Sequence, residues 1–432
     1  MTPEVKQRIE QIRQGIVPEG YKKTKAGILP ESWSVRTIAE CLERVEHPVE
    51  VQANEMYTQI GIRSHGKGLF YKEPVTGDSL GNKSVFWIEP DCFILNIVFA
   101  WEQAIGKTTQ AEAGMIGSHR FPMYRPINGS IDIDYLIAYL LTKRGTDILE
   151  AASPGGAGRN RTLGQDRFMK SRIVLPPLDE QKKIAEILST QDKVIELQGR
   201  KIEELKRFKK GCLEKMFPRK GQKVPEKRFP GFTDDWEQRK LSEMCGTFEY
   251  GLNAAAKEFD GKNKYIRITD IDDASREFLL SDLSSPDICL DGMSKYLLSS
   301  GDIIFARTGA SVGKTYIYRE NDGIVYFAGF LIRAKVNQDN DAEFVFQSTL
   351  SPSYEKYIRI TSQRSGQPGV NAQEYGEYDL FAPSKEEQQR IGHFLRGIDN
   401  LITLHQRKLE EMKNQKKALM QLLLTGIVRV RL

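Results

Sequence analysis

A repeat at a fixed distance of 207 residues constrains the fold of this chain more than any other feature of its sequence. The segment "LPPLDEQKKIAEIL" at 175–188 realigns with "APSKEEQQRIGHFL" at 382–395, and the match continues to residues 210 and 417. Upstream, the triplet Gly106-Lys107-Thr108 recurs at the same distance as Gly313-Lys314-Thr315. Self-similarity of this kind predicts two copies of one structural unit. Each copy is a variable block of about 150 residues followed by a long, charged segment.

The charged segments carry apolar side chains at alternating steps of four and three residues. The clearest of these positions are Ile184, Leu188, Ile195, Ile202 and Leu205 in the first segment and Ile391, Leu395, Ile398, Ile402 and Leu409 in the second. This spacing keeps one seam of a helix turned toward a partner helix, as in a left-handed coiled coil. Pro176-Pro177, Pro383 and Pro218 stand where such helices should begin or end. We expect two helices of roughly 38 residues, over about 179–217 and 386–424, that pair with each other.

Matched polar residues interrupt the apolar seam at two positions. Gln198 corresponds to His405, and Lys209 corresponds to Lys416. The simpler interpretation is that polar residues are tolerated there because they lie near a solvated end. The alternative is that a buried polar residue sets the register by penalising misaligned pairing. We do not expect His405 to bind a metal, because no histidine or cysteine follows it at three or four residues.

The composition describes an ordinary globular protein. Of the 432 residues, 40% are apolar and 28% are charged, and the formal net charge of +5 permits an anionic partner without requiring one. Five scattered cysteines without a C-x-x-C pair favour reduced thiols over disulfides or zinc. The longest apolar run, Cys92 to Trp101, is too short to span a membrane, and the charged N-terminus lacks a signal-peptide core. We therefore expect a cytoplasmic protein.

The stretch "GASVGKT" at 309–315 resembles a phosphate-binding loop, which would indicate an ATPase. That motif needs four residues between its first glycine and the Gly-Lys pair, whereas Gly309 and Gly313 enclose three. The first copy of the repeat, "AWEQAIGKTT", has no glycine at the corresponding place. We expect a repeated structural element here and no nucleotide site.

The variable blocks predict a mixed α/β fold. Segments such as "DCFILNIVFA", "GDIIFAR" and "GIVYFAGFLIRAKV" are strand-like, while residues 133–151 and 342–360 have helical periodicity. Four loops between them combine glycine with cationic or polar residues: "SHGKG", "SPGGAGRNR", "RTGASVGK" and "SQRSGQPG". Glycine allows the backbone amide to approach a phosphate, and arginine supplies charge. Four such loops in two repeated domains favour a polyanionic ligand over plain solvated turns.

Motifs for catalysis on DNA are missing from the sequence. An adenine methyltransferase needs an aromatic-ended Pro-Pro tetrapeptide to hold the flipped base, and only "LPPL" occurs. Neither Pro90-Asp91 nor Pro286-Asp287 is followed by the acidic-x-Lys triple of a common nuclease type. The sequence therefore predicts a binding scaffold and no enzyme.

Several segments together resemble the specificity subunit of type I restriction-modification enzymes. They are the two P-x-x-x-E-Q helix starts, the stretch "KRFPGFTDDWEQRKL" and the tail "LLLTGIVRVRL", and the resemblance extends over essentially the whole chain. It implies two target-recognition domains that each read one half of a bipartite DNA site, separated by an antiparallel coiled coil of the two long helices. The start of the first half, "EGYKKTKAGILPESWSVRTI", differs clearly from the corresponding stretch of the second half.

The resemblance also implies partners: double-stranded DNA, two modification subunits that methylate adenine, and a restriction or motor subunit, with no membrane. S-adenosylmethionine, ATP and Mg would then belong to those partners, and this chain would bind no cofactor or metal and have no catalytic residue. The alternatives are a coiled-coil adaptor with protein-binding domains and an enzyme with a degenerate phosphate loop. Salt-insensitive behaviour without DNA affinity would favour the former, and nucleotide binding by the isolated chain the latter.

The expected organisation is an N-terminal helical segment (1–15), recognition domain 1 (16–177), a central helix (178–221), recognition domain 2 (222–383) and a C-terminal helix and tail (384–432). Arginine and glutamine can pair bidentately with guanine and adenine edges, and lysine is suited to phosphate. The candidate DNA contacts are Arg63, His65, Lys67, Lys107, Arg159, Asn160 and Arg161 in the first half and Arg267, Arg307, Thr308, Lys314, Arg364 and Gln367 in the second. Among these, Lys107 and Lys314 are assigned to phosphate.

Overall fold

The computed structural model describes residues 2–81, 83–155, 161–219, 221–363 and 366–430. The chain divides into two compact units, unit 1 (residues 1–196 and 410–432) and unit 2 (residues 197–409). The division passes through two helices of 39 residues each, α6 (Leu178–Met216) and α11 (Lys385–Leu423). Each unit therefore holds one globular part together with one portion of both helices.

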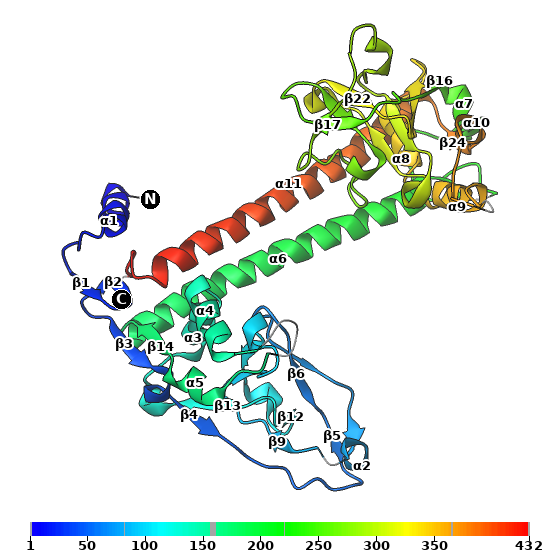
Figure 1. Ribbon diagram of the computed structural model, residues 1–432. Helices are drawn as coiled ribbons and strands as arrows, with labels where there is room; N and C mark the ends of the chain where they lie inside the picture. Colours follow the sequence, from blue (N-terminus) through cyan, green and yellow to red (C-terminus); the bar gives the residue numbers. More distant parts are fainter. Residues whose placement is uncertain (1, 82, 156–160, 220, 364–365, 431–432) are drawn as a thin grey trace. The chain divides into compact units, whose positions relative to one another are not determined.

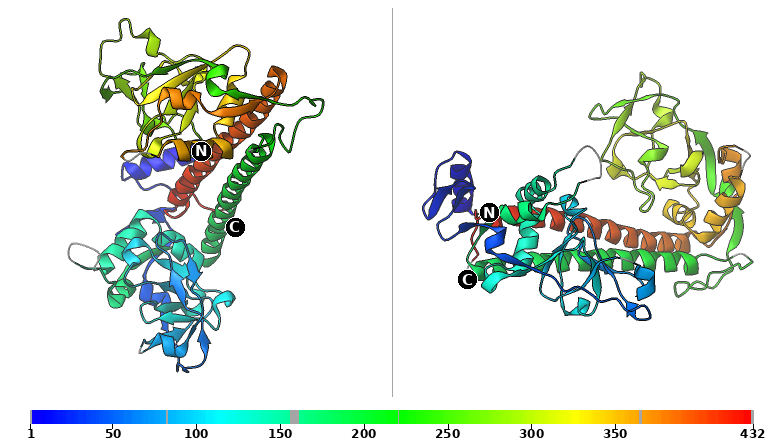
Figure 2. Two further views of the ribbon diagram at one scale, coloured as in Figure 1. Left: turned by 90° about the vertical axis from the view of Figure 1, so that its right-hand side faces the viewer. Right: turned by 60° about the horizontal axis from the view of Figure 1, so that its bottom comes forward.

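The helices α6 and α11 lie side by side and run in opposite directions (Figure 1, Figure 2). The seam buries apolar positions of the heptad pattern, including Ile184, Leu188, Ile202, Ile391, Leu395, Ile398, Ile402 and Leu423. Cross-helix contacts show the antiparallel direction within unit 2, since Gln198 contacts His405 whereas the later Lys209 pairs with the earlier Asp399. In unit 1, Asp192 pairs with Lys416, and the earlier Glu180 pairs with Arg429, which follows α11. The predicted pair of long helices and the antiparallel coiled coil are confirmed.

The polar residues of the seam are not at a solvated end. Gln198 is 9% exposed, and its amide donates to the carbonyl oxygen of His405 at 2.9 Å and lies 2.8 Å from Nδ1 of the same residue. The side chain of Lys209 is 13% exposed and contacts Asp399 at 2.7 Å. The simpler interpretation of tolerated, solvated positions is therefore wrong for Gln198 and Lys209. Both side chains find a partner on the opposite helix, as expected for residues that set the register.

The repeated Glu-Gln pair anchors each long helix to its globular part. The side chain of Gln181 accepts from the backbone N–H of Asp132 at 2.9 Å and donates to the carbonyl of Pro176. In unit 2, Gln388 accepts from the N–H of Asp341 at 3.0 Å and donates to the carbonyl of Pro383. Asp132 and Asp341 cap the helices α3 (Ile133–Leu140) and α8 (Ala342–Ser348). The P-x-x-x-E-Q motif thus binds one helix start to another.

The globular part of unit 1 is built around a four-stranded antiparallel sheet of order β11-β10-β13-β4. Its strands and small helices are β1 (Tyr21–Thr24), β2 (Gly27–Pro30), β3 (Ser34–Thr37), η1 (Ile38–Glu40), β4 (Leu42–Val45), β5 (Met56–Tyr57), β6 (Ile60–Ile62), β7 (Leu69–Tyr71), β8 (Val75–Thr76), α2 (Gly77–Leu80), β9 (Val85–Trp87), β10 (Phe93–Leu95), η2 (Ala100–Glu102), β11 (Ile105–Lys107), η3 (Gln110–Glu112), β12 (Ile116–Ser118), β13 (Met123–Pro126), η4 (Ile127–Gly129), α4 (Lys143–Ala152), α5 (Gln165–Lys170) and β14 (Arg172–Leu175). A further helix, α1 (Pro3–Arg13), precedes β1 and contains no buried residue.

The globular part of unit 2 contains an antiparallel sheet of order β16-β23-β20-β21. Its elements are β15 (Glu237–Lys240), α7 (Leu241–Met244), β16 (Cys245–Tyr250), β17 (Ala256–Glu258), β18 (Lys264–Ile266), η5 (Ile268–Asp270), β19 (Ser284–Pro286), η6 (Ser294–Tyr296), β20 (Ile303–Ala306), η7 (Gly309–Ser311), β21 (Thr315–Ile317), η8 (Glu320–Asp322), β22 (Val325–Phe327), β23 (Leu331–Val336), α9 (Pro352–Thr361), α10 (Ala372–Gly376) and β24 (Asp379–Ala382).

The two sheets are copies of each other. Read from the edge, β11-β10-β13-β4 in unit 1 corresponds to β21-β20-β23-β16 in unit 2, with the same order along the chain. A separate two-stranded pair brings the last strand of each block, β14 or β24, against the first, β3 or β15. The repeat seen in the sequence is therefore a repeat of topology, and the predicted mixed α/β fold is confirmed.

The two segments with helical periodicity each form two helices. In unit 1 the segment breaks at Thr142, whose side chain accepts from Gly145 N–H at the start of α4. In unit 2 it breaks at Ser351, which caps α9, with Pro352 as the first helical residue. Periodicity alone did not reveal these breaks, although a Ser-Pro pair is a typical helix start.

Candidate nucleic-acid interface

A tight turn between β6 and β7 presents three of the candidate residues of unit 1. The N–H of His65 donates to the carbonyl of Glu102 at 2.8 Å, so the turn is fixed against η2. The next residue, Gly66, has φ +63°, and a Cβ there would lie 2.6 Å from the side chain of Leu141. Arg63 and Lys67 flank these residues and are exposed. The glycine of "SHGKG" thus allows a close backbone approach that holds a cationic turn in place.

Two arginines of unit 1 lie over aromatic rings near the same turn. The guanidinium of Arg63 is 5.1 Å from the ring centre of Phe70 and donates to the carbonyl of Leu69. The guanidinium of Arg161 is 5.4 Å from the ring of Trp101, which belongs to η2. The structure therefore brings Arg63, His65, Lys67 and Arg161 to one region around η2. Arg159 and Asn160 lie outside the residues that the structure describes.

The two lysines of the repeated Gly-Lys-Thr triplet are both ion-paired. Lys107, at the end of β11, contacts Asp134 of α3 at 2.7 Å. Burial disfavours its charge, but the hydrogen bond and the charge of Asp134 outweigh that effect and raise its pKa. Lys314, with a side chain 16% exposed, pairs with the exposed Asp273. A phosphate that approached either lysine would have to share it with, or take it from, a carboxylate.

The segment 309–315 is a packed turn and offers no phosphate cradle. The N–H groups of Gly309 and Gly313 donate to the carbonyls of Pro368 and Ala306, both at 3.0 Å. A Cβ on Gly313, which has φ +83°, would lie 2.5 Å from the side chain of Ile358. The glycine amides of this segment donate to carbonyls of the protein, whereas the amides of a phosphate-binding loop point at the ligand. The glycines serve the fold of unit 2, as the repeat suggested.

The loops 307–314 and 362–370 of unit 2 are joined to each other. Val370 N–H donates to the carbonyl of Arg307 at 2.9 Å, and Thr308 forms an isolated β-bridge with Gly369. Gln367 lies beside Gly309, with its amide nitrogen 3.1 Å from the position that a Cβ would take there. Arg307, Thr308 and Gln367 are thereby gathered in one place, and Arg364 lies outside the described residues.

Arg307 and Arg267 line one cavity of about 590 Å³ in unit 2, together with Tyr250, Asn253 and Phe330. Arg267 is neutralised, because Asp270 accepts from its Nε and Nη2 at 2.9 and 3.0 Å and this hydrogen bonding raises its pKa. Arg307 instead lies over two aromatic rings, those of Tyr250 and Phe330, at 5.1 and 6.0 Å from their centres. The cavity combines a free cationic group with exposed aromatic faces.

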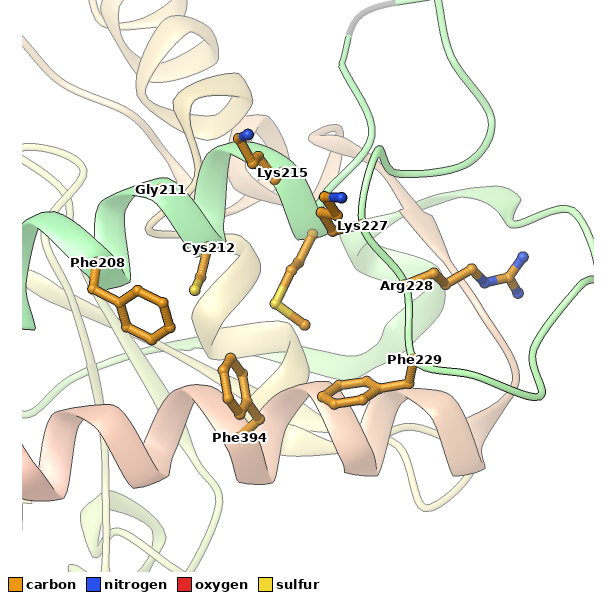
Figure 3. Close-up of a pocket in the computed structure, with 9 residues that line it drawn as sticks. Phe208, Gly211, Cys212, Lys215, Lys227, Arg228, Phe229 and Phe394 are labelled. Atoms are coloured by element: carbon orange, nitrogen blue, oxygen red, sulfur yellow. The ribbon is translucent and has the colours of Figure 1, made fainter.

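A second cavity of unit 2 has a different character (Figure 3). It measures about 430 Å³ and is lined by residues of α6, of α11 and of the segment after α6. Most of them are apolar, and Lys215, Lys227 and Arg228 also contribute to the lining. Phe394 stands near edge-on to Phe208 and to Phe229, with ring centres 6.5 and 5.7 Å apart. None of the candidate DNA contacts lines this cavity. It belongs to the surface of the long helices and not to the cationic loops.

The described residues hold no group of three or more histidine, cysteine or acidic side chains that could bind a metal ion. Among the helices in this part of the chain, none is both long and apolar enough to cross a membrane.

Sequence reasoning missed the aromatic partners of the arginines. Phe70, Trp101, Tyr250 and Phe330 carry no motif, and Tyr250 and Phe330 are 80 positions apart. One signal was present, since Phe70 lies in β7 just after Gly68, and Phe330 follows Gly329 directly before β23. That pattern is too common to identify a site by itself.

Comparison with known proteins agrees with this architecture. The family described as type I restriction modification DNA specificity domain matches residues 84–207 and 233–414. The MjaVIII specificity subunit of a type I restriction enzyme of Methanocaldococcus jannaschii is 25% identical over 97% of this chain and 98% of its own length. The putative MjaX specificity subunit of the same organism is 24% identical over 96% and 97%.

Solved structures share the fold. A chain from a study of complex assembly and conformational transition of the type I R-M system has a TM-score of 0.57 at 16% identity and covers 93% of this chain and 99% of its own. The S subunit of a type I system from M. genitalium has a TM-score of 0.55 at 14% identity, with 93% and 96% covered. In this family the catalytic activities reside in other subunits of the complex. The chain belongs to the type I restriction-modification specificity family and is the DNA specificity subunit of such a system.

Proposed function

We propose that residues 16–177 and 222–383 each read one half of a bipartite site in duplex DNA. The observation that carries this proposal is the duplication of the sheet, β11-β10-β13-β4 in one unit and β21-β20-β23-β16 in the other. Each copy bears arginine over aromatic rings, namely Arg63 and Arg161 in unit 1 and Arg307 in unit 2. The two domains share one sheet topology but differ in their loops. This combination suits the reading of two half-sites with different sequences.

Within each reader, different side chains take different roles. Lys107 and Lys314 contact phosphates and exchange their carboxylate partners for the DNA backbone, which sets affinity and its dependence on salt. The remaining candidates are assigned to the half-sites, and among them the arginines and Gln367 can hydrogen-bond to base edges, which carry the sequence information. The remaining candidates are Arg63, His65, Lys67, Arg159, Asn160 and Arg161 for one half-site and Arg267, Arg307, Thr308, Arg364 and Gln367 for the other.

The helices α6 and α11 set the distance between the half-sites and dock two modification subunits. Matched apolar side chains on these helices support docking, because Leu197 and Leu404 are each 61% exposed and stand 207 residues apart in the repeat. Two equivalent apolar sites fit two copies of one partner. S-adenosylmethionine, ATP and Mg belong to the modification and restriction subunits of the assembled complex. The isolated chain should bind duplex DNA weakly, because it supplies only part of the phosphate contacts.

Exchange of one variable block tests the proposal. Residues 222–383 are replaced by those of another family member that keeps an arginine at the position of Arg228, and the complex is assembled with its modification subunits. Mapping of methylated adenines should show one new half-site and one unchanged half-site. The reciprocal exchange of residues 16–177 is the control and should alter the other half. A change in both half-sites from a single exchange would contradict the two-reader proposal.

Paired insertions test the role of the helices as a spacer. Seven residues placed after Gln198 and seven after His405, which lie opposite each other, lengthen both helices by about 10 Å and preserve the heptad seam. At about 3.4 Å per base pair, the unspecific gap should grow by about three base pairs while both half-sites stay the same. Four-residue insertions at the same places turn the seam away and should reduce activity. Full activity with an unaltered gap would exclude the spacer role.

A further inference from the structure

Arg307 has no carboxylate partner among the described residues, in contrast to four cationic residues of the same globular part. Arg319 and Arg333 bind Glu343 and Glu249, and Lys314 binds Asp273. Arg267 is likewise held by the side chain of Asp270. Within the described ranges, the guanidinium of Arg307 makes neither an ion pair nor a hydrogen bond. Its five N–H donors are therefore available to a ligand.

Two aromatic side chains lie beside this guanidinium. Its central carbon is 5.1 Å from the ring centre of Tyr250 and 6.0 Å from that of Phe330. Contact with a ring engages the face of a guanidinium and leaves the donors along its edge free. Tyr250 is 44% and Phe330 is 60% exposed, which is high for large rings. Such exposure is expected where a ligand completes the contact.

The backbone around Arg307 is fixed from two sides. Its N–H donates to the carbonyl of Phe330 at 3.1 Å, and its carbonyl accepts from Val370 at 2.9 Å. Tyr250 is held in turn, because its hydroxyl accepts from the N–H of Ala372 at 3.3 Å. A long side chain on a fixed backbone, in contact with two rings, loses little further freedom when it binds.

We infer that Arg307 reads a guanine in the half-site of unit 2 and that Tyr250 and Phe330 are the residues that position it. Arginine matches the O6 and N7 acceptors of guanine with two parallel hydrogen bonds, the commonest specific contact in the major groove. A paired arginine such as Arg267 would first have to give up its carboxylate. The inference rests on the proposed function of unit 2 as a DNA reader and assigns one position of the half-site to one side chain.

The test uses the full chain assembled with its modification subunits and a set of duplexes in which each base pair of both half-sites is varied in turn. Arg307→Ala should lower the preference for guanine about ten- to a hundredfold at one position of the unit 2 half-site. Arg307→Lys keeps the charge but removes the planar guanidinium and its two parallel hydrogen bonds. It should also lose the preference for guanine at that same position. Arg359→Ala, an exposed arginine on α9, is the matched control and should change no preference.

The positioning role is tested at Phe330. Phe330→Ala should weaken the guanine preference at the position that Arg307 governs, and Phe330→Tyr, which restores a ring, should recover it. A merely structural role would instead lower the melting temperature without altering which base is preferred.

Three results would overturn the inference. If Arg307→Ala weakens binding equally at every site and flattens its salt dependence, Arg307 is a phosphate contact. If all preferences persist in an active complex, it is not a reader, although the block exchange can still show that unit 2 reads a half-site. If the altered position falls in the half-site of unit 1, the proposed function itself fails.

Discussion

The two units hold a buried glutamate at the start of each long helix in different ways. Glu180 in unit 1 and Glu387 in unit 2 are both fully buried and stand 207 residues apart in the repeat. Glu180 accepts from Arg429 at 2.6 and 2.7 Å and from the indole N–H of Trp33 at 3.1 Å. Glu387 accepts from Arg228 at 2.7 and 2.8 Å.

The tryptophans show where the copies have diverged. Trp236 of unit 2 is as buried as Trp33, yet its indole N–H has no hydrogen-bond partner among the described residues. A buried carboxylate must be compensated by charge and hydrogen bonds, since desolvation otherwise makes it costly. Unit 1 divides this task between an arginine and a tryptophan, and unit 2 assigns it to one arginine. Both units thus compensate a buried carboxylate, but unit 1 uses two side chains for it and unit 2 uses one.

Removal of the arginines should expose that difference most strongly. Arg228→Ala leaves the carboxylate of Glu387 buried without a countercharge and should destabilise unit 2 by about 3–5 kcal/mol. Arg429→Ala should cost unit 1 about 1–2 kcal/mol less, because Glu180 keeps the indole hydrogen bond and Arg429 is 38% exposed. Hydrogen exchange measured by peptide reports each unit separately. Equal losses of stability in the two units would show that the Trp33 hydrogen bond does not help to stabilise the carboxylate of Glu180.

The lysine variants Arg228→Lys and Arg429→Lys serve as controls for this pair. They retain the charge and remove the two-pronged hydrogen bonding, so each should recover part of the loss.

Replacement of the tryptophans should give an intermediate effect. Trp33→Phe and Trp236→Phe remove similar volume from buried positions, so their cavity costs are comparable. Only Trp33→Phe also removes a donor from a buried carboxylate, which should add about 1–2 kcal/mol. The difference between the two variants, measured by hydrogen exchange, therefore reports the Trp33–Glu180 hydrogen bond. A larger loss for Trp236→Phe would mean that its N–H does have a partner.

The cross-helix lysines should give the smallest effect. Lys209 and Asp399 are 13% and 21% exposed, and Asp399 also accepts from Gln347, whereas Lys416 and Asp192 are 22% and 55% exposed. Lys416→Ala should cost under about 1 kcal/mol and lose that effect in 1 M salt. Lys209→Ala should cost about 1–3 kcal/mol and respond less to salt. Thermal unfolding at low and high salt distinguishes them, and the same salt response for both would remove the contrast.

Regular features of the fold could be predicted from the sequence because they repeat over short distances. The heptad seam and the flanking prolines located α6 and α11 to within one or two residues. The strand-like runs were visible, but the order β11-β10-β13-β4 depends on contacts between distant segments. No local pattern indicates that Lys107 faces Asp134 or that Lys314 faces Asp273.

The candidate site was predictable only in part for the same reason. Glycine-rich cationic loops made Arg307 a candidate, since glycine and arginine stand together in the sequence. The rings of Tyr250 and Phe330 contact Arg307 from positions 80 residues apart in the sequence, and only folding brings them together. The simpler interpretation of Gln198 was wrong for the same reason. A polar residue in an apolar seam suggests solvent exposure until the structure shows that His405 lies opposite it.

The arginine contacts of Glu180 and Glu387 have a consequence for genetic recombination. Arg429 follows α11 but supports unit 1, and its partner Glu180 also lies outside residues 16–177. A crossover within residues 16–177 therefore leaves Arg429 and Glu180 in the recipient gene and can exchange only Trp33, the third member of the contact. Arg228 lies within the second block, before Trp236, while its partner Glu387 lies beyond that block. A crossover upstream of codon 228 replaces Arg228, so the incoming gene must supply an arginine at that position. A crossover between codons 228 and 236 keeps the Arg228 of the recipient gene. New DNA specificities should accordingly arise with fewest folding failures when the second block is exchanged downstream of Arg228.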